Sequence, residues 1–167
     1  MPTKSPGKIS LERAKNIADT IVARLKPYCA RIEIAGSIRR RRPLVNDIDI
    51  VLVPSDPWNM KHELMAVGQL TMGGSKIMRL VVPSQVGPLQ VDIYIAMPET
   101  WATLLLIRTG SAANNIRLCT RAKEKGWHLA ASGDGLFDEK GVRIAGDTEV
   151  SIYNALGEKW QEPTERG

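Results

Sequence analysis

Three aspartates in two hydrophobic stretches are the side chains of this sequence best suited to chemistry. Asp47 and Asp49 lie two positions apart in the run DIDIVLV, so a strand would point both carboxylates to one face. Asp92 interrupts a second apolar run, QVDIY, where an isolated acid has no structural purpose. Carboxylates that converge repel one another unless cations offset their charge, and their oxygens suit Mg²⁺. The pattern predicts a two-metal site for phosphoryl transfer.

A Gly-Ser pair and two arginines precede the first two aspartates. As a turn at the end of a short strand, Gly36-Ser37 can present backbone N–H groups and a hydroxyl to a phosphate, and Arg39-Arg40 can pair with the same charge. Each piece has an ordinary alternative, because arginine runs and spaced aspartates are commonly solvated surface. The order and the spacing of the pieces, with Asp92 one hairpin later, favour a phosphate and metal site.

Alternating strand and helix patterns would position these residues. Ser10 can cap the first helix and Pro27 ends it, and residues 83–88 join two strands in a hairpin. Such a mixture predicts an α+β protein. The patterns predict helices at residues 10–26, 58–68, 101–107, 114–125 and 149–156, and strands at residues 31–34, 47–53, 76–82 and 89–96, with short strands near 135–144.

Composition sets broad limits on the function. The chain has 167 residues, 43% of them hydrophobic, which is enough for a core without disulfides or metal. A formal net charge of +5 suits a polyanionic partner but raises the odds of nucleic-acid binding only modestly. Cys29 and Cys119 are expected to be free thiols in a reducing cytoplasm. No apolar run is long enough to span a bilayer. We expect the four tryptophans, Trp58 among them, to pack internally, with Trp127 as the exception that could stack on bases.

The motifs together resemble a known family. Gly36-Ser37-x-Arg39-Arg40 followed by Asp47-x-Asp49 resembles the active-site signature of the polymerase beta nucleotidyltransferase superfamily, which covers many activities. The second half of the chain narrows the resemblance to family X DNA polymerases, over about residues 8–163. The segments that carry it are Thr109-Gly110-Ser111 with Asn115, Lys125-Gly126-Trp127, Gly135-Leu136-Phe137, Thr148-Glu149, and Leu156-Gly157 with Glu162-Pro163.

The resemblance implies an α+β fold in two parts and a DNA polymerase activity. A palm subdomain at 1–98 would carry a mixed or antiparallel sheet with two helices on one face, and a small α/β thumb subdomain would follow at 99–167. The expected reaction adds deoxynucleotides to a primer 3′-hydroxyl in short-gap filling or repair, with two Mg²⁺ ions (Mn²⁺ as the alternative). Expected partners are primer-template or gapped DNA and deoxynucleoside triphosphates, for a monomer in the cytoplasm of a bacterial cell, or of the host if viral.

The resemblance also implies a role for each site residue. Asp47, Asp49 and Asp92 would be the catalytic metal ligands. Gly36, Ser37 and Arg40 would bind the triphosphate, whereas Arg39 would serve structure. Thr109 and Gly110 would pack on the nucleotide sugar and Asn115 would reach the base. Lys76 would touch the DNA backbone. Arg117 and Arg121 share one predicted helix and form a candidate duplex-binding surface, with a solvated face as the alternative.

The sequence departs from the family pattern in three places. The lyase domain and helix-hairpin-helix motifs of larger members are expected to be absent. Gln90 stands where relatives often carry Arg, and Ile107-Arg108 replaces an aromatic pair, which predicts weak discrimination against ribonucleotides. Two other functions stay open: a minimal nucleotidyltransferase that modifies RNA, protein or a small molecule, and a non-catalytic nucleic-acid-binding module. The thumb motifs argue against the first, and the complete aspartate set argues against the second.

Overall fold

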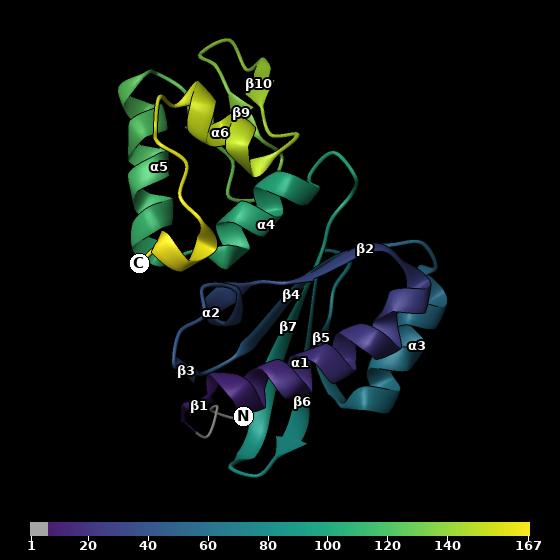
Figure 1. The fold of residues 1–167 in the computed structure, drawn as a ribbon. Coiled ribbons are helices and arrows are strands. Elements are labelled where there is room, and N and C mark those ends of the chain that lie inside the picture. The colour runs from purple at the N-terminus through teal and green to yellow at the C-terminus, as the bar shows by residue number, and fades with distance from the viewer. Residues whose placement is uncertain (1–6) are drawn as a thin grey trace.

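The computed structural model describes residues 7–167 (Figure 1). Two 3₁₀ helices, η1 (Lys26–Tyr28) and η2 (Pro163–Glu165), accompany the regular elements. The helices are α1 (Leu11–Leu25), α2 (Gly36–Arg39), α3 (Pro57–Val67), α4 (Trp101–Thr109), α5 (Ala112–Glu124) and α6 (Glu149–Ala155). The strands are β1 (Ile9–Ser10), β2 (Cys29–Ile34), β3 (Leu44–Val45), β4 (Ile48–Pro54), β5 (Gln69–Gly73), β6 (Ile77–Ser84), β7 (Gly87–Ile95), β8 (His128–Leu129), β9 (Leu136–Phe137) and β10 (Arg143–Ala145).

A five-stranded mixed sheet organises the N-terminal half, in the order β2-β4-β7-β6-β5. Its central pair, β4 and β7, is parallel, and the other neighbouring pairs are antiparallel. One face of both central strands is apolar and buried, with Ile50 of β4 and Ile93 of β7 on it, whereas the other face carries Asp49 and Asp92 beside buried Val51 and Tyr94. The C-terminal half, green to yellow in Figure 1, carries α5, α6 and the small β10-β9-β8 sheet. The expected α+β class is confirmed.

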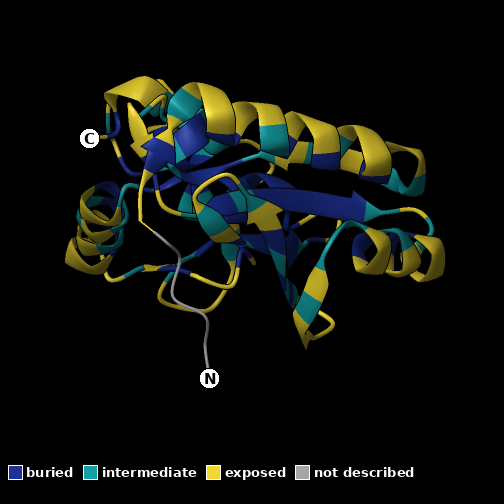
Figure 2. Cartoon of the chain, turned by 90° about the horizontal axis from the view of Figure 1, so that it is seen from below, coloured by how far each residue is buried: buried dark blue, intermediate teal, exposed yellow. Residues whose placement is uncertain are grey.

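Helices α1 and α3 cover one face of the sheet. The side chain of Ser10 accepts a hydrogen bond from the Arg13 N–H at the start of α1, and Asp56 caps α3 in the same way. In α1, buried Ala14, Ala18, Ile21 and Leu25 recur every three or four residues and pack on the sheet. Figure 2 shows the result, with buried residues on the inner sides of the helices and exposed residues outside.

Helix α4 packs against the opposite face and connects the two halves. Trp101 and Leu105 belong to the same buried cluster as Val51 and Tyr94 of the sheet. The next residue, Leu106, belongs to a separate core made entirely of the C-terminal half. The expected division between residues 98 and 99 falls in the connection between β7 and α4.

Three local expectations were wrong or incomplete. Gly36-Ser37 was expected as a turn, but it opens the one-turn helix α2. Strand β5, which pairs with β6, was not predicted, because Gly73 and the polar Gln69 and Thr71 break the alternating pattern. Trp58 is not buried: 73% of it is exposed and its ring lies 4.7 Å from that of His62. Within residues 7–167, no helix has the length and apolar character required for a membrane span.

Candidate active site

Parallel pairing of the central strands brings two of the aspartates together. Asp49 of β4 lies directly opposite Asp92 of β7, so both side chains share one face. That face also carries Val51 and Tyr94, which pack against α4. Asp47, half-buried, immediately precedes β4 at the same end. The parallel register of β4 and β7 therefore brings Asp92 beside Asp49, and Asp47 lies two positions before Asp49 in the chain.

The Gly-Ser segment lies against this acidic strand. The Ala35 N–H donates to the Asp49 carbonyl at 2.8 Å, so the end of β2 is fixed beside β4. Gly36 follows with φ of +61°, and a Cβ at this position would lie 2.2 Å from Asp49 Oδ2. Only glycine permits such an approach, because it has no Cβ and tolerates positive φ. The phosphate-binding candidate and the acidic pair thus form one site.

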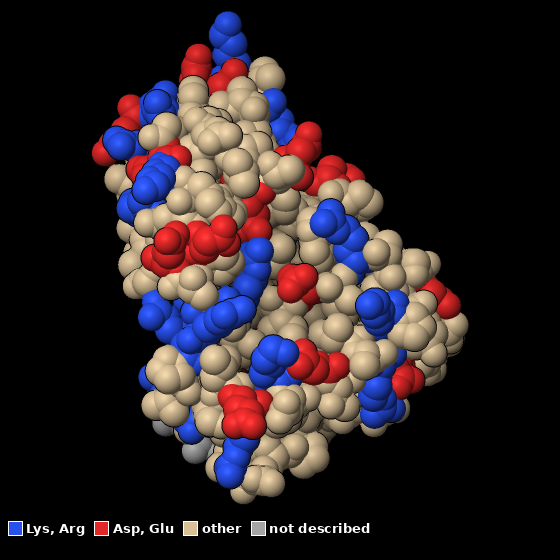
Figure 3. All heavy atoms as spheres, viewed as in Figure 1, with Lys and Arg blue, Asp and Glu red and all other residues tan. Residues whose placement is uncertain are grey.

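Both halves of the chain line a cleft of about 640 Å³ around these residues. Figure 3 shows Lys and Arg side chains beside acidic ones along the boundary between the two halves. The lining brings together most of the residues expected to bind metal or nucleotide, namely Gly36, Ser37, Arg40, Asp47, Asp49, Thr109, Gly110 and Asn115. Asp92 and the three expected DNA-binding residues do not line it.

Asp49 is the acid in the cleft whose pKa is shifted most. Burial, together with the negative charges of Asp92 and Asp47, raises the pKa of Asp49 to about 7. The Tyr94 hydroxyl donates to Asp49 Oδ1 at 3.3 Å, and the Arg108 guanidinium lies 4.2 Å from the Tyr94 ring centroid. Burial and the neighbouring carboxylates also raise the pKa of Tyr94. A bound cation would offset the charge that these contacts leave uncompensated.

Asp92 is only 6% exposed and is held by neighbours on the sheet. Arg79 Nε donates to its Oδ1 at 2.7 Å, and Gln90 Nε2 lies 3.2 Å from its Oδ2. Among residues 7–167, no group of three or more His, Cys, Asp or Glu side chains is arranged so that it could hold a metal ion. The chemistry of the donors nevertheless suits divalent cations, since Asp49 and Asp92 are register partners on adjacent strands and carboxylate oxygens are hard ligands.

The turn after α4 is held in place by the two arginines of α2. Arg40 donates to the Thr109 carbonyl and Arg39 donates to the Thr109 hydroxyl at 2.9 Å. Asn115 donates to the Ile107 carbonyl at 2.8 Å. Gly110 adopts φ of +70°. Three buried atoms in this part of the cleft have no partner within the described chain: Arg40 Nε, Arg108 Nε and Asn115 Oδ1. Buried polar atoms without a partner are uncommon in proteins, and these three belong to residues that line the same cleft.

Glu149 connects this arrangement to the C-terminal half. It pairs with Arg39 at 2.7 Å and with Arg166 at 2.8 Å, and the Arg166 side chain is fully buried. Burial alone would raise the pKa of Glu149, but the two guanidinium groups lower it below its ordinary value. Arg39 therefore serves structure, as expected: it joins α2 to α4 and α6.

The expected DNA-binding residues lie outside the cleft. Lys76 is exposed beside a second cavity of about 440 Å³, whose lining includes Tyr94 and Arg108. Arg117 and Arg121 both pair with Glu158, at 3.0 and 3.1 Å. Their role in binding DNA stays a prediction. In the free protein each guanidinium already has a carboxylate partner, Glu158.

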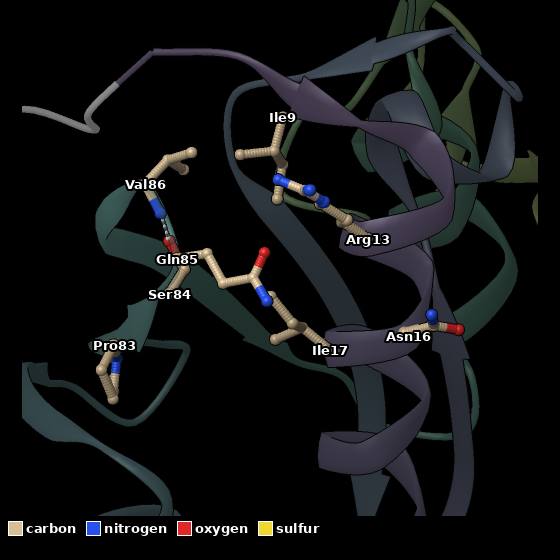
Figure 4. Close-up of a pocket in the computed structure, with 8 residues that line it drawn as sticks. All are labelled: Ile9, Arg13, Asn16, Ile17, Pro83, Ser84, Gln85 and Val86. Carbon is tan, nitrogen blue, oxygen red and sulfur yellow. Dashed lines mark hydrogen bonds between the residues drawn. The ribbon is translucent and has the colours of Figure 1, made fainter.

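The most apolar large cavity is separate from the acidic site. It has a volume of about 660 Å³ and lies between α1 and the β6–β7 turn, where Ile9 and Ile17 face Pro83 and Val86 (Figure 4). No residue expected to bind metal, nucleotide or DNA lines it. Phosphoryl transfer needs charge and metal ligands, so this cavity is not the candidate active site.

Four residues of the site were absent from the sequence-based prediction. Tyr94 follows Asp92 by two positions on the same strand face, a signal that the alternation rule could have provided. Arg79 also lies on an alternating strand. Arg108 and Glu149 lie at the site because their helices pack there, and no local sequence pattern predicts contacts of this kind.

Comparisons with known proteins agree with the motifs. Residues 104–167 match the family model described as DNA polymerase beta thumb. The chain is 28% identical over 136 residues to the "DNA polymerase/3'-5' exonuclease PolX" of Bacillus subtilis, covering 78% of this chain and 24% of that protein. It is 24% identical over 174 residues to the "Repair DNA polymerase X" of African swine fever virus (isolate Warthog/Namibia/Wart80/1980), covering 95% of this chain and 99% of the viral protein.

A yeast relative extends the comparison. The "DNA polymerase type-X family protein pol4" of Schizosaccharomyces pombe is 26% identical over 180 residues, covering 94% of this chain. The chain spans 33% of the length of this protein and 24% of the bacterial one, but nearly the full length of the viral one.

Proposed function

Because the chain belongs to the family X DNA polymerases, we propose that it adds deoxynucleotides to a primer 3′-hydroxyl by two-metal phosphoryl transfer, in short-gap filling or repair. The observation that carries this proposal is the pairing of Asp49 with Asp92 beside the Gly36-Ser37 segment, at a cleft that Thr109 and Gly110 close from the C-terminal half. In this proposal, residues 1–98 act as the palm and residues 99–167 as the thumb.

The residues of the chain would divide the reaction between them. Asp47, Asp49 and Asp92 would hold two Mg²⁺ ions, with Mn²⁺ as the alternative. Such ions, when bound, lower the pKa of the primer hydroxyl and offset charge on the departing pyrophosphate. Ser37 and Arg40 bind the triphosphate and hold it in line, and the free Nε of Arg40 supports this role.

The nucleotide itself would occupy the thumb side of the cleft. Thr109 and Gly110 are buried at the end of α4 and provide a surface against which the sugar packs. Asn115 has a buried, unpartnered Oδ1 that can accept a hydrogen bond from the base. Phosphoryl transfer asks for positioning and charge neutralisation, and these groups supply the positioning. The substrates are deoxynucleoside triphosphates and primer-template or gapped DNA, bound by a monomer in the cytoplasm.

Primer extension tests the proposal. The purified protein, with Mg²⁺ or Mn²⁺, is offered labelled primers on gapped, recessed and single-stranded DNA. We expect extension on gapped or recessed DNA and at least a thousandfold loss with Asp49→Ala, which removes a metal ligand. The proposal fails if the wild type extends none of these primers, or if Asp49→Ala retains activity within tenfold. Transfer of label from a triphosphate to RNA, protein or a small molecule instead of DNA would identify a different nucleotidyltransferase.

A further inference from the structure

Arg79 occupies a position that none of the roles above explains. It lies on β6, directly opposite Asp92 of β7 in the antiparallel register. Its Nε donates to Asp92 Oδ1 at 2.7 Å, and Gln90 Nε2 approaches both oxygens of the same carboxylate, at 3.4 and 3.2 Å. The orientation of Asp92 is therefore set from the neighbouring strand, by the only cation in ion-pair contact with it among the described residues.

The ion pair is asymmetric. The Asp92 side chain is 8% exposed, whereas the Arg79 side chain is 38% exposed. Both terminal nitrogens of Arg79 form no hydrogen bond or ion pair with another described residue. A guanidinium has five N–H donors in a rigid fork, so one edge can bind the carboxylate while the other binds a phosphate.

The ion pair places the Arg79 guanidinium next to one of the three aspartates of the candidate site. Arg79 does not line the cleft that holds Ser37 and Arg40, the residues proposed to bind the triphosphate. A phosphate bound by the exposed edge of Arg79 would therefore belong to the DNA and not to the nucleotide.

We propose that Arg79 is a positioning residue that couples the DNA primer to Asp92: its Nε edge orients the carboxylate and its outer edge binds a phosphodiester next to the primer 3′ end. This inference rests on the proposed polymerase function and adds to it the residue that aligns the primer strand. Gln90 lies next to the same carboxylate but provides no charge, so the cation comes from β6 instead of β7.

Binding measured without metal tests the phosphate contact. Fluorescence anisotropy with gapped DNA in EDTA, over a series of NaCl concentrations, compares the wild type with Arg79→Gln and Arg79→Lys. We expect Arg79→Gln to weaken binding about five- to tenfold and to reduce the log–log salt slope by about 0.9, the value for one phosphate contact. Arg79→Lys should fall between, because a lysine cannot span both partners. Arg24→Gln is the matched control, since Arg24 pairs with Glu63 at the same 2.7 Å, on α1, and should bind as the wild type does.

Kinetics and a relocated arginine test the coupling to Asp92. Arg79→Gln should lower kcat with gapped DNA about tenfold or more while the KM for the nucleotide stays within about twofold, because the triphosphate cleft is untouched. The double variant Arg79→Gln/Gln90→Arg returns a guanidinium to the Asp92 carboxylate from β7. It should recover kcat and DNA affinity to within about threefold of the wild type, which a merely structural role for Arg79 does not predict.

The outcomes separate the two proposals. If the wild type extends primers but Arg79→Gln keeps wild-type DNA affinity and salt slope, the inference is wrong and the polymerase function stands. An unchanged kcat in Arg79→Gln, or a loss of kcat that the double variant does not recover, would also overturn it. If the wild type neither binds gapped DNA nor extends any primer, the polymerase function itself fails.

Discussion

Asp49 is the residue at which packing and chemistry conflict most directly. Its carboxylate is largely buried next to two other acids, and its pKa is raised to about 7. A raised carboxyl pKa means that the folded state prefers the protonated form. Its contribution to stability is fully present below about pH 4 and is lost as pH rises through 7, so the metal-free protein is under electrostatic strain at neutral pH.

Asp49→Asn should therefore stabilise the metal-free protein while abolishing nucleotide addition. At pH 8 in EDTA we expect a gain of about 1–3 kcal/mol in the free energy of unfolding, because the amide carries no charge to repel Asp47 and Asp92. At pH 4 the difference should vanish, since the wild-type carboxyl is then protonated. Urea unfolding at the two pH values measures both. A variant less stable than the wild type at pH 8 would contradict this account.

A substitution at Gly36 gives a second test at the scale of one residue. Gly36→Ala should reduce activity at least a hundredfold, because the new Cβ would lie 2.2 Å from Asp49 Oδ2 and displace the carboxylate. Gly157→Ala is the matched control: its φ of +68° is similar to the +61° of Gly36, but no atom lies within 4 Å of its Cβ. Both variants share the backbone cost of positive φ, about 1 kcal/mol or slightly more. Primer extension by the two should differ sharply, and equal activities would refute the steric argument.

At the scale of elements, the Arg39–Glu149–Arg166 network connects α2 and α6 to the C-terminal end of the chain. Arg166 also lies 4.9 Å from the Trp160 ring centroid and donates to the Gln161 carbonyl. Because Arg39 and Arg40 both hold Thr109, the network fixes the end of α4 relative to α2 across the cleft. The carboxylate of Glu149 therefore joins α2, α6 and the C-terminal end of the chain through one shared set of ion pairs.

Glu149→Gln should destabilise the protein by about 2–4 kcal/mol at pH 7, because it leaves the buried Arg166 guanidinium without its counter-charge. The pKa of Glu149 is lowered in the folded state, so this stability is present above about pH 4.5 and is lost as pH falls further. Thermal unfolding of the two proteins should accordingly converge at low pH. Glu124→Gln removes an exposed pair with Arg121 and should change stability by less than about 0.5 kcal/mol. Equal losses in both variants would contradict the network.

At the scale of the whole molecule, the two halves share a core. Val51, Val53 and Tyr94 of the sheet are buried only because Trp101 and Leu105 of α4 pack on them. The C-terminal half also has a core of its own, which begins at Leu106. The cleft follows from this arrangement, since α4 ends at Thr109 directly above the acidic strands.

Separating the halves should therefore expose the shared core. We expect the full chain to unfold in one cooperative transition and residues 1–98 alone to bind a hydrophobic dye and to unfold at least about 10 °C lower, because the second sheet face loses its cover. Calorimetry and dye fluorescence test this. Two separated transitions in the full chain, or an equally stable fragment, would show that the halves are independent.

The sequence by itself determined the class of chemistry and the elements that carry it. Residues two apart on a strand share a face, so the sequence assigns Asp47 and Asp49 to one candidate site, and their role there stays a prediction. Ser10 and Pro27 placed the ends of the first helix, because capping and helix termination depend on neighbours a few positions away. The Gly36 segment was assigned to the site but not as a helix, because a single turn leaves too short a pattern to recognise.

Only the tertiary structure decided which groups surround those aspartates. The parallel register of β4 and β7 set Asp92 opposite Asp49, and antiparallel pairing with β6 placed Arg79 on Asp92. Glu149 lies 110 positions from Arg39, and Arg117 and Arg121 both pair with Glu158 while remaining partly exposed. Contacts between distant segments depend on strand order and helix packing over the whole molecule. No local pattern in the sequence encodes them, which is why the acids could be identified in advance and their partners could not.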